Sequence, residues 1–165
     1  MYPNVVKVED IAVEVKFRDY ERGDERAVFR IVKDVLATYG LRTNPAVTDS
    51  DLSDISESYI RPGGVFRIVE VEGEIVGSYG LYPVSVKVCE LRKMYLMPIY
   101  QGRGIGKMMM DEVLALARAK GFEEIVLETN SVLVRATQLY EKYGFAYYEP
   151  AHLSDRCDSA MRLRL

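Results

Sequence analysis

Histidine, cysteine and tryptophan are scarce in this chain of 165 residues, which has one, two and none of them. Cys89 and Cys157 do not form a CxxC pair, and His152 has no second histidine beside it, so we expect no metal site. Isolated apolar cysteines are most often reduced core residues in a cytoplasmic protein, and a disulfide is allowed but not implied.

The sequence also lacks a long apolar run and an excess of one charge. No segment approaches the roughly 18 residues needed to cross a bilayer, and residues 1–10 lack the apolar stretch of a signal peptide. The formal net charge of -3 is too small to suggest a DNA or RNA partner. We therefore expect a cytoplasmic protein without membrane or nucleic-acid partners, folded as one domain over residues 1–165.

Hydrophobic periodicity predicts strands and helices that share one sheet. We expect strands over 12–17, 65–71, 74–81, 85–97, 124–129, 145–149 and 158–165, and helices over 21–39, 48–59, 104–120 and 132–143. Along 85–97 the even positions change from apolar to charged at Glu90 and Arg92 and then return, which predicts a bulge or a face that opens onto a site. The order predicts a mixed α/β (α+β) sheet with helices against it and no room for a second domain.

The most informative segment is the glycine-bearing turn between a strand and a helix. It reads Gln101, Gly102, Arg103, Gly104, Ile105, Gly106 and Lys107. Unpaired amides at a helix N-terminus bind phosphate oxygens, glycines let the anion come close, and Arg103 and Lys107 add positive charge. The alternative is a turn whose glycines only cap the helix.

Spacing distinguishes between the phosphate-binding patterns that this turn resembles. A Walker loop needs Gly at position 101 and Ser or Thr after the lysine, where the chain has Gln101 and Met108. A dinucleotide fingerprint needs its third glycine where Lys107 stands. Neither pattern fits.

The third pattern is Gln or Arg, two residues, Gly, one residue, and Gly or Ala, which Gln101, Gly104 and Gly106 satisfy. This stretch resembles the pyrophosphate-binding turn of the GNAT family of N-acetyltransferases. A second stretch, Ala-Thr-Gln-Leu-Tyr-Glu-Lys-Tyr-Gly-Phe at 136–145, is similar to the later helix of that family and the strand after it. The resemblance covers residues 88–145 and implies a GNAT-type fold, a mixed and mostly antiparallel seven-stranded sheet flanked by four helices.

The resemblance further implies that acetyl-CoA lies between the strands expected at 85–97 and 124–129. The backbone of Met94, Tyr95 and Leu96 would bond the pantetheine arm as an added strand does, and the turn at 101–107 would hold the pyrophosphate.

Asn130, just after a strand, bonds to the cofactor in this interpretation. Many family members instead have Asn at the point where Leu133 stands, three residues before Ala136. The alternative for Asn130 is that it is the N-cap residue of the following helix.

For catalysis, the resemblance implies that Tyr140 is the general acid that protonates the departing sulfur, since a phenol with a pKa of about 10 suits a thiol of about 8.5. The alternative is a tyrosine that packs against the sheet. Glu90 stands where some members place a general base, which would deprotonate the amine through water. The alternative for Glu90 is a plain ion pair with Arg92. No histidine lies near either cysteine in sequence, so we expect direct transfer in a ternary complex.

The expected function is transfer of the acetyl group of acetyl-CoA to a primary amine of a small molecule or peptide. Two alternatives are a non-catalytic acetyl-CoA-binding module and a transferase of a longer acyl group, which an enlarged cleft near Met94 would permit. Edge strands at the C-terminus allow a homodimer.

Two further groups are candidates for the acceptor pocket. The first is the acidic set Asp49, Asp51, Asp54 and Glu57. One interpretation is that this set attracts a cationic amine. The alternative is that it compensates a helix dipole on a solvated surface. The second is Tyr147, Tyr148 and His152. These line a pocket or are surface and sheet residues.

Overall fold

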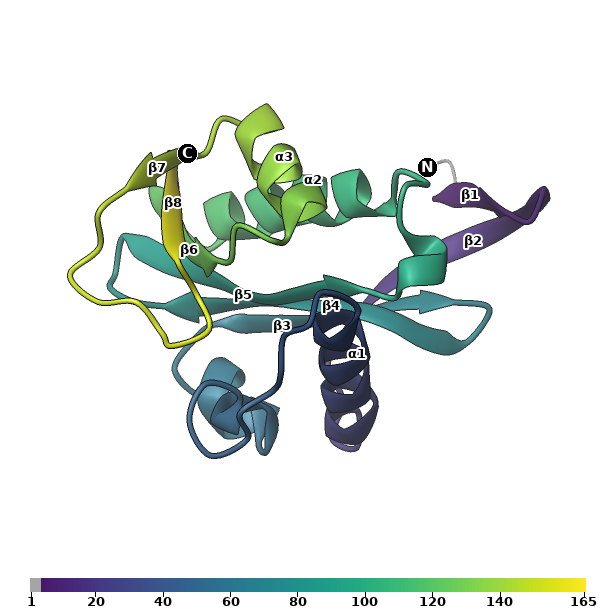
Figure 1. The fold of residues 1–165 in the computed structure, drawn as a ribbon, viewed down its shortest axis with the longest axis horizontal. Coiled ribbons are helices and arrows are strands. Elements are labelled where there is room, and N and C mark those ends of the chain that lie inside the picture. Colours follow the sequence, from purple (N-terminus) through teal and green to yellow (C-terminus); the bar gives the residue numbers. More distant parts are fainter. Residues whose placement is uncertain (1–3) are drawn as a thin grey trace.

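One twisted sheet organises residues 4–165, which a computed structural model describes (Figure 1). Within these residues the strand order is β1-β2-β3-β4-β5-β6-β8-β7, an eight-stranded sheet. The strands are β1 (Val5–Val8), β2 (Ile11–Asp19), β3 (Val65–Val71), β4 (Glu74–Pro83), β5 (Val88–Leu96), β6 (Glu124–Thr129), β7 (Ala146–Tyr148) and β8 (Ser159–Arg164). Only β5 and β6 pair in parallel among the described strands, so the predicted mixed and mostly antiparallel sheet is confirmed.

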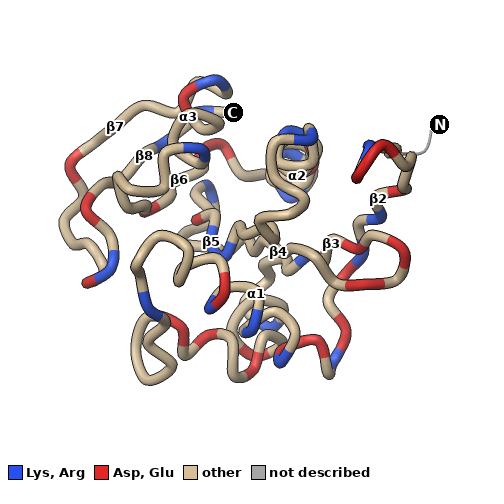
Figure 2. The backbone as a smooth tube through the Cα atoms, turned by 45° about the vertical axis from the view of Figure 1, so that its right-hand side comes forward, with Lys and Arg blue, Asp and Glu red and all other residues tan. Residues whose placement is uncertain are grey.

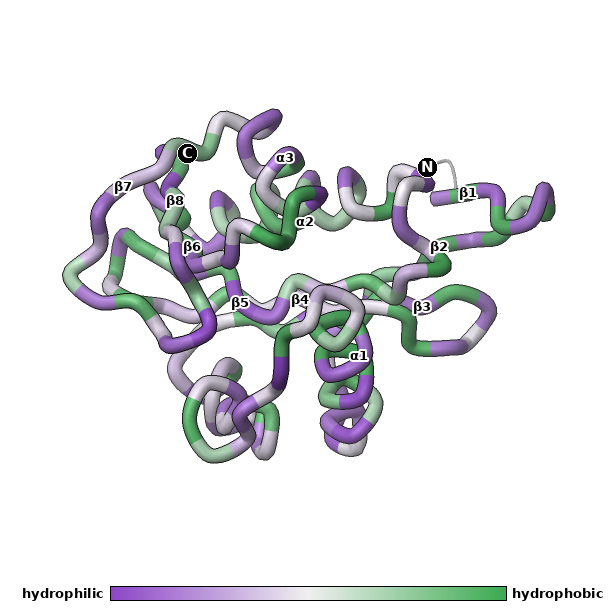
Figure 3. The backbone as a smooth tube through the Cα atoms, viewed as in Figure 1, coloured by the Kyte–Doolittle hydropathy of each residue, from purple (hydrophilic) through white to green (hydrophobic). Residues whose placement is uncertain are grey.

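Helices cover both faces of the sheet. Figure 1 shows α2 (Ile105–Ala119) and α3 (Val134–Lys142) on one face and α1 (Glu25–Thr38) on the other. Met109, Met110 and Val113 of α2 pack on the first face. Val28, Val32 and Leu36 of α1 pack against Phe66 on the second. Figure 3 shows hydrophobic and hydrophilic residues following one another along these helices, as expected for helices with one buried side.

The sheet contains one strand more than the seven predicted, because β1 pairs with β2 in a hairpin. Glu9 and Asp10 at its turn have φ angles of 50° and 66°. Positive φ at both central residues is the geometry of a type I′ turn, which matches the twist of the flanking strands. No strand before residue 12 was predicted from the sequence.

The helix predicted over 48–59 is broken into a 3-10 turn, η1 (Ser50–Leu52), and a short π-helix, η2 (Ser56–Ile60). Aspartates interrupt it by binding main-chain amides: Asp49 accepts from Asn44 N at 2.7 Å and Asp54 accepts from Glu57 N at 3.0 Å. Such local bonds compete with helical ones. With α1, α2 and α3, this segment makes the four helical regions expected, and a 3-10 turn, η3 (Pro98–Tyr100), precedes α2.

An opening in the sheet arises where β5 and β6 separate. The two strands pair only from Val88 with Glu124 to Glu90 with Val126. Beyond this point β5 has a bulge, because Arg92 pairs with Gly80 and Tyr95 with Ser78, which leaves Lys93 and Met94 opposite one residue of β4. The predicted bulge is therefore confirmed, and the β6-facing edge of β5 has no strand partner in residues 4–165 after Glu90.

Candidate functional site

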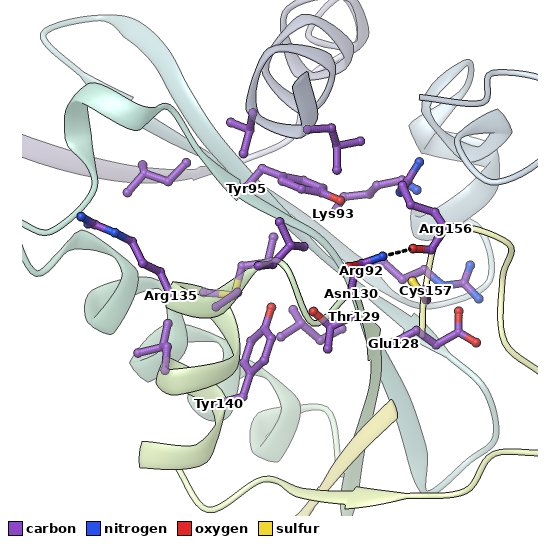
Figure 4. Close-up of a pocket in the computed structure, with 18 of the residues that line it drawn as sticks. Arg92, Lys93, Tyr95, Glu128, Thr129, Asn130, Arg135, Tyr140, Arg156 and Cys157 are labelled. Atoms are coloured by element: carbon purple, nitrogen blue, oxygen red, sulfur yellow. Dashed lines mark hydrogen bonds between the residues drawn. The ribbon is translucent and has the colours of Figure 1, made fainter. Parts of the chain in front are cut away.

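A cleft of about 950 Å³ passes through the opening between β5 and β6. We call the part lined by residues 101–109 and by α3 the α2 half. We call the part lined by residues 35–51 and 152–157 the α1 half. Residues of β5 and β6 line the cleft between the two halves. Figure 4 shows Arg135 of the α2 half and Arg156 of the α1 half at opposite ends of this cavity.

The glycine turn supplies main-chain amides to the α2 half. Gly104 is the N-cap of α2 with a φ of 87°, Gly102 has a φ of 72°, and no side chain caps the helix. The amides of the first turn therefore have no partner within the helix and carry a partial positive charge. Residues of the predicted set that line the cleft here are Gln101, Gly102, Gly104, Gly106 and Lys107.

Two other side chains of the turn are directed elsewhere. Arg103 donates to the carbonyl oxygens of Ile99 at 2.9 Å and Lys7 at 2.7 Å, outside the cleft lining. Ile105 is fully buried in the core. For these two residues, main-chain contact with a cofactor stays a prediction.

Lys107, Arg135 and Lys142 are the cations at this end of the cleft. Lys107 lines it and pairs with Asp111 at 2.8 Å. Arg135, which sequence reasoning missed, lies so close to Gly102 that a Cβ there would be 3.0 Å from Arg135 Nη1. The only sequence signal for Arg135 is its position directly before Ala136 of the second motif.

The open edge of β5 brings Met94, Tyr95 and Leu96 to the cleft, and their main-chain contact with a cofactor stays a prediction. Gln101 Nε2 donates to the Leu96 carbonyl at 2.8 Å, which fixes the turn against the end of β5. The edge itself is available for main-chain hydrogen bonds to an extended ligand, in the manner of an added strand.

Tyr140 extends from α3 with its hydroxyl directed into the cavity (Figure 4). Its side chain is 7% exposed and its ring lies 5.7 Å from that of Phe145. Burial raises the pKa of Tyr140, so the phenol keeps its proton at neutral pH. Tyr140 therefore packs against its neighbours and also presents a proton donor to the cleft, as both interpretations of it require.

Two carboxylates face the α1 half from neighbouring strands. Glu90 binds Arg92 at 2.6 Å, so the predicted ion pair is present. On β6, the side chains of Ile125 and Leu127 belong to the core beneath α2. Successive side chains of a strand point to opposite faces, so Glu128 points to the other face of the sheet. It lines the cleft at the point where the strands have separated.

Glu128 was missed in the sequence analysis, although alternation along 124–129 would have assigned its face. Ser154 Oγ donates to Glu128 Oε2 at 2.8 Å. Figure 4 shows Glu128 and Tyr140 on opposite sides of Thr129. A proton acceptor and a proton donor therefore flank the end of β6.

Asn130 links β6 to the loop between β7 and β8. Its Nδ2 donates to the Arg156 carbonyl at 2.7 Å, and its Oδ1 accepts from Val132 N at 3.0 Å. The alternative that made Asn130 the N-cap of the next helix is wrong, because Leu133 has that position. Contact of Asn130 with a cofactor stays a prediction.

The aspartate at 49 is buried among cations. Its carboxylate accepts from Arg156 at 2.7 and 3.0 Å and lies 2.9 Å from Lys93 Nζ. Burial alone would raise the pKa of Asp49, but the bonds and charges of Arg156 and Lys93 outweigh it and lower the pKa to about 2.

The other members of the acidic set are also engaged. Asp51 accepts from the Tyr59 hydroxyl, and Glu57 pairs with Arg61 at 2.6 Å. Asp49 and Asp51 therefore fasten the chain, whereas Glu57 and Arg61 form a solvent-exposed pair.

The remaining candidates are divided between cleft, core and surface. His152 and Cys157 line the α1 half, and Tyr147 is 56% exposed on β7. Tyr148 stacks with Arg162 at 5.2 Å. Cys89 is fully buried in the core, as expected, and both cysteines are free.

Residues 4–165 contain no cluster of three or more His, Cys, Asp or Glu suited to a metal ion. No helix among them combines the length and the hydropathy of a bilayer-spanning segment. Figure 2 shows charges of both signs interspersed along this part of the chain.

Comparisons with known proteins agree with the geometry. The sequence model of the acetyltransferase (GNAT) family matches residues 28–145. The N-acetyltransferase YjgM of Escherichia coli is 36% identical over 78% of this chain and 80% of its own length. N-acetylaspartate synthetase of Xenopus tropicalis is 36% identical over 59% of this chain, which spans only 37% of that protein.

Solved structures share the fold. A GNAT acetyltransferase from Staphylococcus aureus superposes with a TM-score of 0.84 at 20% identity, over 91% of this chain and 98% of the other. A putative acetyltransferase from Salmonella typhimurium, solved with its cofactor acetyl-CoA, superposes with a TM-score of 0.70 at 18% identity, over 91% and 93% of the two chains.

Proposed function

Because this chain belongs to the GNAT family of acyl-CoA-dependent N-acetyltransferases, we propose that it moves the acetyl group of acetyl-CoA to a primary amine by direct attack in a ternary complex. One observation carries the proposal: the uncapped glycine turn of α2 and the hydroxyl of Tyr140 face the same cleft. Phosphate binding and proton donation are thereby brought together at an opening in the sheet.

The α2 half fits the elongated, anionic cofactor. The free amides around Gly104 and the guanidinium of Arg135 suit its phosphates, and the open edge of β5 suits the amides of its pantetheine arm. When bound, acetyl-CoA supplies an acetyl group activated as a thioester. The α1 half then receives the acceptor.

Glu128 and Tyr140, on the two sides of the end of β6, suit the two proton transfers of the reaction: one from the amine and one to the sulfur. Glu128 takes a proton from the ammonium of the acceptor, directly or through water, since an alkyl ammonium has a pKa near 10 and cannot attack until it is deprotonated. As the new C–N bond forms and the C–S bond breaks, Tyr140 gives its proton to the departing sulfur, and the second proton lost by the attacking nitrogen restores Tyr140, directly or through water. Glu90 remains a second candidate for the base, but its ion pair with Arg92 favours Glu128.

The protonation of Cys157, the cysteine that lines the cleft, supports transfer without an acyl-enzyme. Burial raises the pKa of Cys157, which keeps it as a neutral thiol, and thiols are weaker nucleophiles than thiolates. Cys89 is fully buried. The amine of the acceptor is therefore the nucleophile in this proposal.

The names of two similar proteins concern amino-acid acceptors, which indicate here only the size of the acceptor; the carboxylates of those acceptors are not carried over to this chain. One is the N-acetylaspartate synthetase described above. The other is N-acetylglutamate synthase of Neisseria gonorrhoeae, which at 18% identity supports the fold alone. A small amine of amino-acid size is consistent with these names and with the family.

The test measures cofactor binding and turnover separately. Calorimetry with coenzyme A should detect binding, and a thiol reagent should detect release of coenzyme A from acetyl-CoA in the presence of a panel of amines and short peptides. Tyr140→Phe should bind coenzyme A as wild type does but lose release, whereas Tyr147→Phe, on exposed β7, should retain both. No heat with coenzyme A would contradict the proposal.

Two alternatives are separated by the same assay. Binding without release for every amine would favour a non-catalytic acetyl-CoA-binding module. Faster release from butyryl-CoA than from acetyl-CoA would favour a transferase of longer acyl groups.

A further inference from the structure

We propose that the acceptor is a primary amine carried on an apolar body, without a second ionised group. This inference rests on the proposed function, in which the α1 half of the cleft receives the acceptor. Two observations carry it: one wall of the α1 half is apolar, and the buried charged side chains beside that wall already have partners.

The apolar wall begins on α1 and continues along the chain after it. Val35, Leu36 and Tyr39 contribute from the end of α1, and Leu41 and Val47 contribute from the segment that follows. Val47 is 64% exposed, so an apolar side chain stands at the entrance with no protein cover. Contact with an apolar acceptor would remove this surface from water, which is favourable.

The cations near this wall have little capacity left for a carboxylate. Lys93 and Arg156 meet at one end of the cavity (Figure 4), where both bind Asp49. Their side chains are 7% and 12% exposed, and that of Asp49 is fully buried. An acceptor carboxylate would have to displace a bidentate, desolvated partner of Arg156.

The nearby carboxylates are engaged in a similar way. Asp51 accepts from the Tyr59 hydroxyl and lies 3.2 Å from Lys93, and Glu90 binds Arg92. Glu128 is held by Ser154 and faces the reacting amine in the proposed mechanism. Asp51 Oδ1 accepts no hydrogen bond but lies beside Lys93, so a second cation on the acceptor would have to compete with Lys93, Arg92 or the reacting amine for these carboxylates. A buried charge without a full partner is costly.

Two ionisable residues of this half remain, and both lie at its rim. His152 and Asp155 are on the exposed loop between β7 and β8. Water and salt screen charges at such positions, so we expect them to contribute little to selection of the acceptor.

The experiment compares three amidated amino acids whose side chains differ in their terminal group. Norleucinamide ends in a methyl group, isoglutamine in a carboxylate and argininamide in a guanidinium, and each has a single acylatable α-amine. We expect kcat/KM for norleucinamide to exceed that for each of the others by about tenfold or more, because apolar groups of this size are worth that much in a matching pocket. An equal or higher value for isoglutamine or argininamide would overturn the inference.

Variants then test the two observations one at a time. Asp49→Asn should release Arg156 and Lys93 and raise the ratio of kcat/KM for isoglutamine to that for norleucinamide by about tenfold. Val47→Lys should raise the same ratio through the exposed wall without disturbing the core, so it serves if Asp49→Asn fails to fold. The control Val86→Lys, at a position that is 86% exposed and outside the cleft lining, should leave the ratio unchanged.

Failure of this inference and failure of the proposed function give different results. If no amine releases coenzyme A, the proposed function fails. If release occurs but charged acceptors are preferred, or if Val47→Lys and Val86→Lys give the same ratio, only the inference fails.

Discussion

The α2 and α1 halves of the cleft are built in different ways. The α2 half depends on one contiguous turn whose main-chain amides face the site, with glycines at φ angles that other residues avoid. The α1 half joins segments far apart in sequence, fastened by the pair between Asp49 and Arg156, which are 107 positions apart. Cofactor binding should therefore be sensitive to backbone changes, and acceptor selection to changes in side-chain charge.

The sharpest test of this division concerns the base that serves both halves. Glu128→Gln keeps the size of the side chain and the bond from Ser154 but removes the charge. We expect kcat to fall by about 10² to 10⁴, the usual worth of general base catalysis, with coenzyme A affinity unchanged. Steady-state kinetics and calorimetry would measure the two quantities.

The matched variant is Glu90→Gln, on the neighbouring strand and in an ion pair with Arg92. We expect a smaller loss of kcat from it. If Glu90→Gln has the larger effect and Glu128→Gln is nearly silent, the roles of the two carboxylates are the reverse of those proposed.

A backbone change in the α2 half should affect the cofactor alone. Gly104→Val places a β-branched residue at a φ of 87° and should distort the turn. We expect coenzyme A to bind about 10 to 100 times more weakly, because one or two charge-assisted bonds to phosphate would be lost. Calorimetry measures this change.

The control is Gly121→Val at the other end of α2, where φ is 83° and a Cβ would meet nothing within 4 Å. It imposes similar strain but lies away from the cleft lining. Equal loss of affinity in both variants would show that general destabilisation, and not the turn, is responsible.

A charge change in the α1 half should alter stability in a pH-dependent way. The pKa of Asp49 is lowered in the folded protein from 3.8 to about 2, which corresponds to about 2 to 3 kcal/mol of stability. Because the folded pKa is depressed, this stabilisation is complete above about pH 4 and is lost as the pH falls toward 2.

Asp49→Asn should therefore be less stable than wild type at pH 7 by at least this amount, since Lys93 and Arg156 also lose their partner. Urea unfolding at pH 7 and at pH 3 would measure the difference, which should shrink at the lower pH. A difference that is the same at both values would show that Asp49 is not the titrating group.

The two halves also differ in what the sequence could predict. Glycine spacing specifies local backbone geometry, so the turn at 101–107 and the fold around it were predicted from residues that are neighbours in the chain. The bulge of β5 was predicted because Glu90 and Arg92 changed the pattern of one face. These signals are short-range.

The rest of the site depends on contacts that no local pattern encodes. The acidic set was interpreted as a helix face, but Asp49 bonds instead to Asn44, Lys93 and Arg156 and interrupts that helix. Arg135 and Glu128 are candidates only because of the tertiary fold, which brings Arg135 beside Gly102 and Glu128 to the point where β5 and β6 separate.

The smallest expected effect concerns a side chain of the α2 half. Arg135→Ala should weaken coenzyme A binding by about tenfold, the worth of one charge-assisted hydrogen bond to a phosphate, because the amides of the turn remain. KM for the amine should stay the same. The control Arg118→Ala, in the last turn of α2 and away from the cleft, should change neither value. A loss far above tenfold would mean that a side chain, and not the main chain, dominates phosphate binding, and the contrast between the two halves would fail.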